Sequence, residues 1–208
     1  MGNQKLEYCD TERDLGVIMS TDLKVESQCN EACLKANWRT FVVKTPEVML
    51  NLHKTLVRSH LEYCISAWSP HYQKDKKLLE KVQHRFTRMI TSLKSLQYEA
   101  RLQKLGLWTF EERRNRADLI EVFKMAHGLS AIPLTDMFQI DTTGRTRGHS
   151  LKLVKCRCNK DIRKYFFSHR VVCKWNMLDN DSVMAKTVNG FKTKLERERA
   201  KKMGLFSD

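Results

Sequence analysis

The stretch TFEERRNRADLIEVFKMAHG, residues 109–128, carries the clearest structural signal in this sequence. Thr109 followed three residues later by Glu112 is a capping-box signature, in which each side chain accepts a hydrogen bond from the other residue's backbone N–H at a helix start. Gly128 can adopt the left-handed conformation that ends a helix. The stretch therefore predicts a long helix from Thr109 to about His127.

Another helix is predicted upstream, from about Lys74 to Thr91, because apolar side chains recur there at helical spacing. This apolar stripe consists of Leu78, Leu79, Val82, Phe86, Met89 and Ile90. The opposite side of the same helix carries a row of basic side chains, Lys77, Lys81, His84 and Arg88. Such a row either follows the phosphates of a nucleic acid or is a solvated face.

The remaining apolar patterns also favour helices. They predict helices from about Ser27 toward Val42, from Pro46 toward Trp68, from Gln97 to Leu105, from Asp161 through Leu178, and from Thr187 into the tail. The helix after Pro46 is expected to turn Met49, Leu52 and Leu56 toward the core. In the helix after Asp161 the aromatic side chains Phe166, Phe167 and Trp175 are expected to be core residues rather than platforms on which bases stack.

Strands are expected in two places only. Leu6 and Tyr8 alternate with polar neighbours, and a polar turn over residues 10–14 separates them from the apolar run Leu15–Met19, so the N-terminus predicts a β-hairpin. The segment Ser150–Lys155 is a candidate strand, because leucine alternates with lysine there.

The charge of the chain is high and unevenly distributed. The formal net charge is +14, which attracts polyanions, and nucleic acid is the first partner to consider. Residues 1–28 hold 3 basic and 6 acidic side chains, whereas residues 144–208 hold 17 and 6. The densest part is residues 145–174, where Asp161 is the one acid among ten cations, and Arg163, Arg170 and Lys174 are expected to share one helix flank. This asymmetry indicates a binding region.

Composition argues against several other classes of protein. No run of about 18 apolar residues suits a membrane span, and the N-terminus lacks the apolar core of a signal peptide, so a soluble nuclear or cytoplasmic protein is expected. The seven cysteines form no disulfide-like framework. Cys29 and Cys33 lie on an apolar helix face and are expected to be buried. Cys156 and Cys158 lie in a basic loop near histidines, where zinc is the less favoured alternative.

Six segments of the sequence together resemble one protein family. They are ERDLGVIMSTDLK (12–24), LVRSHLEYCISAWSP (56–70), LLEKVQHRFTRMI (78–90), YEARLQKLGLWTFEERRNRADLIEVFKMAHG (98–128), GRTRGHSLKLVK (144–155) and KYFFSHRVVCKWNML (164–178). In order and spacing they resemble the region after the catalytic palm in reverse transcriptases of LINE-type, non-LTR retrotransposons of the jockey-like and chicken-repeat-like kinds. The similarity covers nearly the whole chain.

The sequence also departs from the family pattern. The family's palm holds three metal-binding aspartates, two of them adjacent, and this sequence has no Asp-Asp pair. Residues 1–7 resemble the interior of the hairpin that ends the palm, so the reading frame is expected to begin inside the parent polymerase. The chain is shorter than the family before Pro46, lacks a Leu-Pro step near Leu178, and has Ser59 where the family usually has proline.

The resemblance implies a mainly α fold with three parts. These are a palm-derived β-hairpin over residues 1–26, a thumb-like helical bundle over residues 27–130 and a small basic helical module over residues 131–208. It also implies a fragment of an RNA-directed DNA polymerase that binds the RNA or DNA backbone without reading bases. The residues expected to contact that backbone are Lys77, Lys81, His84, Arg88, Arg145, Arg147, Lys152, Lys155, Arg157, Arg163, Arg170 and Lys174.

No catalytic activity is expected of the chain on its own. Polymerisation uses two metal ions held by clustered carboxylates, and Asp10, Glu12 and Asp14 are interpreted as a solvated turn. No catalytic residue, metal, cofactor, small-molecule substrate or membrane partner is therefore assigned. Two other readings remain open, a translated transposon remnant without function and a protein-interaction module.

Overall fold

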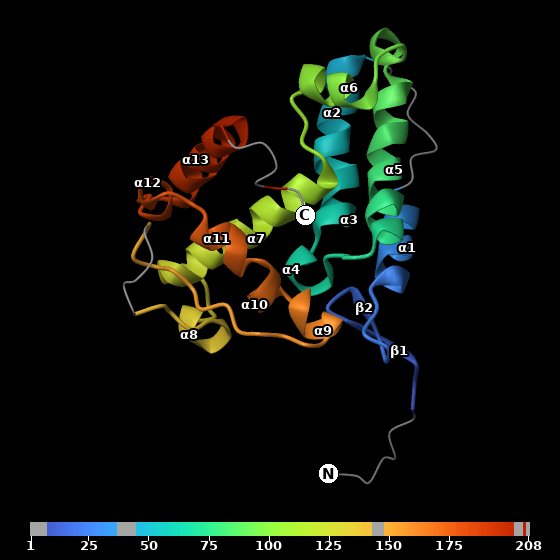
Figure 1. Ribbon diagram of the computed structural model, residues 1–208. Helices are drawn as coiled ribbons and strands as arrows, with labels where there is room; N and C mark the ends of the chain where they lie inside the picture. Colours follow the sequence, from blue (N-terminus) through green and yellow to red (C-terminus); the bar gives the residue numbers. More distant parts are fainter. Residues whose placement is uncertain (1–7, 37–44, 143–147, 202–205, 207–208) are drawn as a thin grey trace. The chain divides into compact units, whose positions relative to one another are not determined.

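The structure, a computed structural model, describes residues 8–36, 45–142, 148–201 and 206. Within these residues the chain is mostly helical with one small antiparallel sheet, so the mainly α class is confirmed (Figure 1). It divides into an N-terminal unit, Met1–Cys64 with Trp68–Leu107, and a C-terminal unit, Ile65–Ala67 with Trp108–Asp208. These units differ from the domain boundaries expected at residues 26 and 130.

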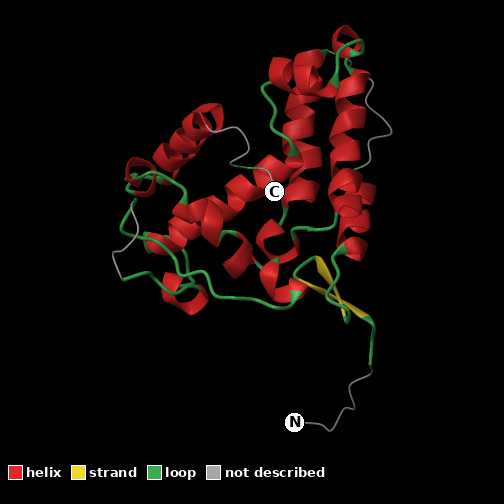
Figure 2. Cartoon of the chain, in the orientation of Figure 1, coloured by secondary structure: helices red, strands yellow, loops and turns green. Residues whose placement is uncertain are grey.

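The predicted β-hairpin is present near the N-terminus (Figure 2). Its second strand overlaps the predicted apolar run, but its first strand and its turn are not where the sequence predicted them. β1 (Thr11–Asp14) pairs with β2 (Val17–Ser20) in antiparallel register. Between them Leu15 and Gly16 both have positive φ, 44° and 85°, as a two-residue type I′ turn requires. Glycine tolerates this conformation, so the turn forms at Gly16 and the acidic segment predicted as the turn becomes the first strand. Leu6 lies outside the described residues.

The hairpin and the first helix form one side of the N-terminal unit. α1 (Glu26–Lys35) is the helix predicted from Ser27, and it buries Cys29 completely. The backbone N–H of Ile18 donates to Oε1 of Gln28 at 2.8 Å, which joins the hairpin to this helix. α1 also packs on α3 (Arg58–Glu62) and α5 (Gln73–Met89). The predicted extension toward Val42 falls outside the described residues.

The helix that begins at Pro46, as predicted, is continuous through residue 62 but irregular. α2 (Pro46–Leu52) passes through a π-helical turn, η1 (His53–Val57), into α3. A π turn inserts an extra residue into the helical repeat and so rotates the side chains that follow it. Val57 is therefore buried, whereas Leu56, which was predicted to face the core, is 51% exposed.

The main helix of the N-terminal unit is α5, which matches the apolar stripe of the sequence. Leu79, Phe86 and Ile90 of that stripe are buried, while Met89 at the end of the helix is exposed. Two short elements follow it, η2 (Thr91–Leu93) and α6 (Tyr98–Leu105). The short helix α4 (Ile65–Trp68), which precedes it in the chain, belongs mostly to the C-terminal unit. One hydrophobic cluster of the N-terminal unit consists of Met49, Phe86, Ile90, Leu93, Tyr98, Leu102 and Leu107. Gly106, with φ 60°, ends α6 as predicted.

The C-terminal unit is built on the helix with the clearest sequence signal. α7 (Phe110–Ala126) has the predicted capping box, with Glu112 N–H donating to Thr109 Oγ1 at 3.2 Å and Thr109 N–H donating to Glu112 Oε2 at 3.0 Å. Against it pack α8 (Leu134–Met137) and α13 (Val188–Lys201), the latter near the predicted last helix. α12 (Asn180–Val183) is a further short helix that the sequence did not predict. The largest fully buried side chains in this unit's core include Trp175, Phe123 and Phe191.

The helix predicted over Asp161–Leu178 is broken into three. α9 (Asp161–Lys164), α10 (Phe167–Arg170) and α11 (Val172–Asn176) replace it, and Phe166 between the first two is extended, with φ −65° and ψ 150°. The breaks change which residues face the core, because a helical spacing holds only within one continuous helix.

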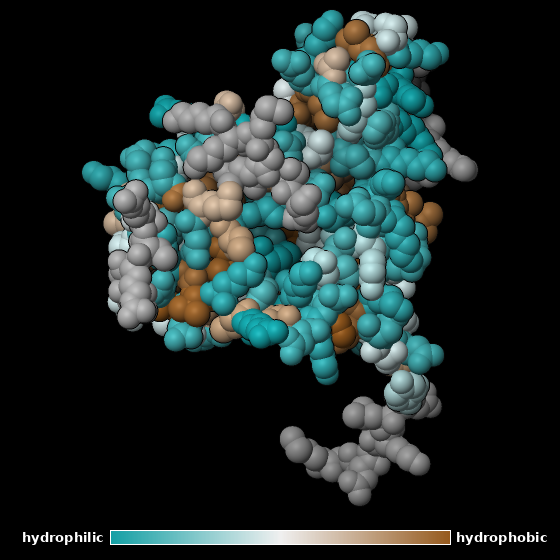
Figure 3. Space-filling model, in the orientation of Figure 1, coloured by the Kyte–Doolittle hydropathy of each residue, from teal (hydrophilic) through white to brown (hydrophobic). Residues whose placement is uncertain are grey.

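The candidate strand over Ser150–Lys155 is an extended segment with a single β-bridge, from Leu153 to Ile140. In the face drawn in Figure 3, hydrophilic side chains cover most of the surface of the described residues. None of the helices in the described ranges is long and apolar enough to cross a membrane.

Candidate nucleic-acid interface

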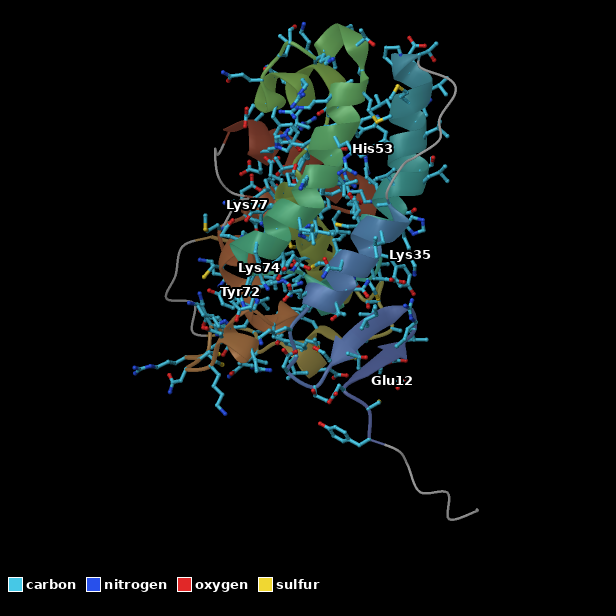
Figure 4. All side chains as sticks on the ribbon, turned by 90° about the vertical axis from the view of Figure 1, so that its right-hand side faces the viewer. Glu12, Lys35, His53, Tyr72, Lys74 and Lys77 are labelled. Carbon is cyan, nitrogen blue, oxygen red and sulfur yellow. The ribbon has the colours of Figure 1, made fainter. Side chains whose placement is uncertain are left out.

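The basic row on α5 is present only in part. Lys77, Lys81 and Arg88 are exposed, at the spacing that the sequence predicted. Figure 4 shows Lys77 near the start of α5, on the side away from α2. These three side chains can contact phosphates, because each is a long cation on one face of a helix.

His84 does not belong to this exposed row. Its ring stacks on Tyr98, with centroids 3.4 Å apart and 17° between the planes. Burial, reinforced by the nearby charges of Arg101 and Arg88, lowers the pKa of His84 below its ordinary value of 6.5. The imidazole is therefore neutral at pH 7 and is no phosphate-binding cation, contrary to the expectation from spacing alone.

The titration of His84 can be measured directly by NMR. We expect its ring protons to titrate at lower pH than in an unstructured peptide of residues 80–88, because the folded environment disfavours the imidazolium. A depressed histidine pKa adds stability above about pH 6.5 that is lost as the pH falls through the acid range. Tyr98→Leu, which uncovers the ring, should move the folded value up toward that of the peptide. A folded-state pKa at or above the peptide's would contradict this assignment.

His84 lies beside a buried polar network that supports α5 from within the N-terminal unit. The Tyr98 hydroxyl donates to Glu80, and Gln83 Nε2 donates to the Tyr98 oxygen at 3.0 Å. Gln83 Oε1 lies 3.3 Å from the ring nitrogen Nε2 of His53. His53 is fully buried and stacks on Phe86, between α5 and the helix formed by α2 and η1 (Figure 4). These contacts hold the helix that presents the cations.

The densest exposed charge lies in the C-terminal unit, on the segment before α9 and on α9 itself. Five cations within ten residues are exposed there, Lys155, Arg157, Lys160, Arg163 and Lys164. Asp161 is the one acid among them. Lys152 is half-buried, and Arg145 and Arg147 lie outside the described residues. Among the described cations of the predicted basic region, these five are exposed, whereas Lys152, Arg170 and Lys174 are half-buried.

The segment that carries these five cations, here called the basic segment, is held by side chains of α11 and α10. The backbone N–H of Leu153 donates to Asn176 Oδ1 at 2.9 Å, and Asn176 Nδ2 donates to the Leu153 carbonyl at 2.8 Å. His169 Nε2 lies 2.6 Å from the carbonyl oxygen of Cys156, which can only accept this hydrogen bond. The Lys155 ammonium donates to Cys173 Sγ at 2.9 Å. These bonds attach the cationic segment to the buried core.

Arg170 corrects the expectation that it shares an exposed flank with Arg163 and Lys174. Its guanidinium forms a bidentate pair with Asp118 of α7, at 2.8 Å and 3.0 Å. It also donates to the carbonyl oxygens of Tyr165, Ile65 and Ser66, at 3.1, 3.3 and 3.1 Å. All three guanidinium nitrogens thus donate hydrogen bonds inside the C-terminal unit, and Arg170 is a structural residue.

Lys174 also lies near the buried acid. Burial raises the pKa of Asp118, and the charges of Arg170, Lys174 and Arg114 oppose that rise. Lys174 is half-buried on α11, one helix beyond Arg170. The three expected flank residues are therefore distributed over three helices, and only Arg163 is on the exposed basic segment.

Phe166 is a surface residue that the sequence placed in the core. It is 43% exposed, whereas Phe167 and Trp175 are buried as predicted. The sequence did contain a signal for this, because three consecutive aromatics, Tyr165 to Phe167, cannot all occupy one helix face.

The cysteines do not assemble a recognisable metal centre in the described residues. Cys29 is buried as expected, Cys33 is half-buried and Cys156 is exposed. Among the residues whose positions are known, no three His, Cys, Asp or Glu side chains gather in a way that could hold a metal ion.

The chain matches no protein-family model, no curated protein and no solved structure. The geometry of the basic segment and the sequence resemblance are therefore the grounds on which a function can be proposed.

Proposed function

We propose that this chain binds the backbone of RNA or DNA without reading its bases, as a thumb-like and C-terminal region derived from a non-LTR retrotransposon reverse transcriptase. The observation that carries the proposal is the exposed basic segment, defined as Lys155, Arg157, Lys160, Arg163 and Lys164. Five exposed cations in ten residues repel one another, so a polyanionic partner relieves an unfavourable arrangement.

The chemistry of these side chains suits phosphate rather than base edges. A duplex carries about one phosphate charge per 1.7 Å of its axis, so several flexible cations can each find an oxygen without a fixed sequence. Contacts to phosphates set position and affinity but carry no sequence information. The exposed row on α5 in the N-terminal unit, which consists of Lys77, Lys81 and Arg88, is a second, smaller set of the same kind.

The proposal includes binding of nucleic acid but not its polymerisation, for two reasons. The six segments that resemble the reverse transcriptase family lie after the palm in that family, and this sequence has no adjacent aspartate pair. Polymerisation requires such carboxylates to hold two metal ions. The proposed activity is therefore binding alone.

The test is the salt dependence of binding by a triple variant, Lys160→Gln with Arg163→Gln and Lys164→Gln. Affinity for a duplex of arbitrary sequence is measured by fluorescence anisotropy at several salt concentrations. Loss of three phosphate contacts should make the slope of log affinity against log salt shallower by about 2–3 units. These side chains are exposed, so circular dichroism should not change.

A matched control removes the same charge from elsewhere in the C-terminal unit, by Lys186→Gln, Lys192→Gln and Arg197→Gln. Arg199 and Lys194 are left intact because they pair with Glu112 and Asp181. If net charge alone attracts nucleic acid, both triples weaken binding equally. That outcome would reject the proposed interface and favour a remnant without a dedicated site.

A further inference from the structure

Phe166 is exposed because the backbone around it is held in a corner. It is the extended residue between α9 and α10, and its neighbour Phe167 is 3% exposed and belongs to the core. Phe166 is the N-cap of α10 and lies outside the helix that begins with the buried Phe167, so burial of Phe167 does not bury Phe166 as well.

Arg170 holds this corner from the inside. It donates to the Tyr165 carbonyl at 3.1 Å, just before the extended residue. Its guanidinium carbon lies 5.8 Å from the centroid of the Phe167 ring, and its pair with Asp118 anchors it to α7. The exposure of Phe166 is thus maintained by a buried ion pair rather than by a loose loop.

One cation lies near the exposed ring, and two more are close to it in sequence. The guanidinium carbon of Arg163 lies 6.0 Å from the Phe166 centroid. Lys164 is exposed on the same short helix, and Lys160 is exposed at its N-cap. His169 joins the neighbouring segment to α10 through the Cys156 carbonyl, which keeps the cations of that segment close to the corner. An exposed aromatic ring beside several cations matches a base with its flanking phosphates, because the ring stacks on the base and the cations pair with the backbone.

We propose that Phe166 is a stacking platform for one unpaired base of single-stranded RNA or DNA, with Arg163 and its neighbours on the adjacent phosphates. This inference rests on the proposed function and makes it more specific. Bases inside a duplex have both faces covered by their neighbours, so a single strand uses the platform far better than a duplex. A membrane is the less suitable occupant, because α9 has four residues and cannot lay an amphipathic face along a lipid surface.

The experiment compares a single strand with a duplex on the full chain. Binding of an oligouridylate of about 12 nucleotides and of a duplex of the same length is measured for the wild type and for Phe166→Ala. We expect the single strand to bind about 5- to 150-fold more weakly, which corresponds to the loss of one base–aromatic stack, with duplex affinity changed by less than about 2-fold. Met184→Ala, which removes another exposed apolar side chain of the C-terminal unit, should change neither affinity.

A second variant reports stacking itself. Phe166→Trp should retain single-strand affinity, and its tryptophan fluorescence, taken as the difference from the wild type, should be quenched by the oligouridylate because a base stacks on the indole. Equal loss of single-strand and duplex binding in Phe166→Ala, no loss of either, or an unquenched tryptophan would each overturn the platform. Loss of binding only to phosphatidylserine vesicles would overturn it too and assign the ring to a lipid surface. The proposed function is tested separately: it is rejected if the two triple variants weaken binding to the duplex equally.

Discussion

Replacing Arg170 by alanine is expected to destabilise the C-terminal unit by about 3–5 kcal/mol, because removal of one partner leaves a buried charge unpaired. Asp118 is 2% exposed, and Arg170 contacts both of its carboxylate oxygens. The same substitution deprives the carbonyl oxygens of Tyr165, Ile65 and Ser66 of a donor. Urea denaturation followed by circular dichroism measures the change in unfolding free energy.

The control is Arg163→Ala on the neighbouring short helix. Arg163 is exposed, so its removal should change the unfolding free energy by no more than about 0.5 kcal/mol. A double-mutant cycle with Asp118→Ala should give a coupling energy clearly different from zero, since the two groups are in contact. Equal stability of the two arginine variants would mean that the ion pair does not support the corner.

The loss of unfolding free energy in the Arg170→Ala variant should depend on pH in a defined direction. Burial raises the pKa of Asp118, and loss of Arg170 removes the main opposing charge, so this pKa rises further in the variant. A carboxyl group with a raised folded-state pKa binds protons more tightly in the folded protein, so it costs stability as the pH increases. The deficit should therefore be larger at pH 7 than in the acid range where Asp118 is protonated.

Replacing Asn176 by alanine is expected to lower the free energy of unfolding by about 2–6 kcal/mol and to loosen the basic segment. Asn176 pairs with both backbone groups of Leu153, and the bridge to Ile140 occupies the other edge of this extended segment. The Asn176 side-chain amide thus makes the two hydrogen bonds that a neighbouring strand would make with Leu153. Without it two backbone groups of a residue that is 2% exposed are left unpaired, at about 1–3 kcal/mol each.

Two measurements check this prediction. Urea denaturation gives the loss of stability, and hydrogen exchange should accelerate at the Leu153 amide more than at amides in the middle of α7. Asn159→Ala, at an exposed asparagine of the same basic region, is the matched control and should have little effect on either. If the Leu153 amide exchanges at the same rate in both variants, the Asn176 bonds do not hold the segment.

The sequence predicted well those features that depend on a few adjacent residues. The capping box of Thr109 and Glu112 formed as expected, and Gly106 and Gly128 adopt the positive φ that ends their helices. These are local rules, because a cap needs only the backbone groups of one helical turn. The strongly periodic helix α5 was located for the same reason, since its stripe lies within one unbroken helix.

Predictions of buried residues from helical spacing were wrong where the backbone departs from a regular helix. The π turn at His53–Val57 replaced Leu56 by Val57 in the core, and the corner at Phe166 divided the helix predicted after Asp161. Each irregularity shifts the face of every later residue, so a single unrecognised break misplaces several side chains. No local sequence rule specified either break.

The sequence by itself determined the helical class, the helix ends with capping signals and the concentration of positive charge toward the C-terminus. Only the tertiary structure decided which of the basic residues are available to a partner. Arg170 and Arg163 are the same residue type on neighbouring helices, yet one is bound to a buried carboxylate and the other is exposed. The difference arises because Asp118 comes from a helix distant in sequence, and a buried charge requires a partner from whichever segment packs beside it.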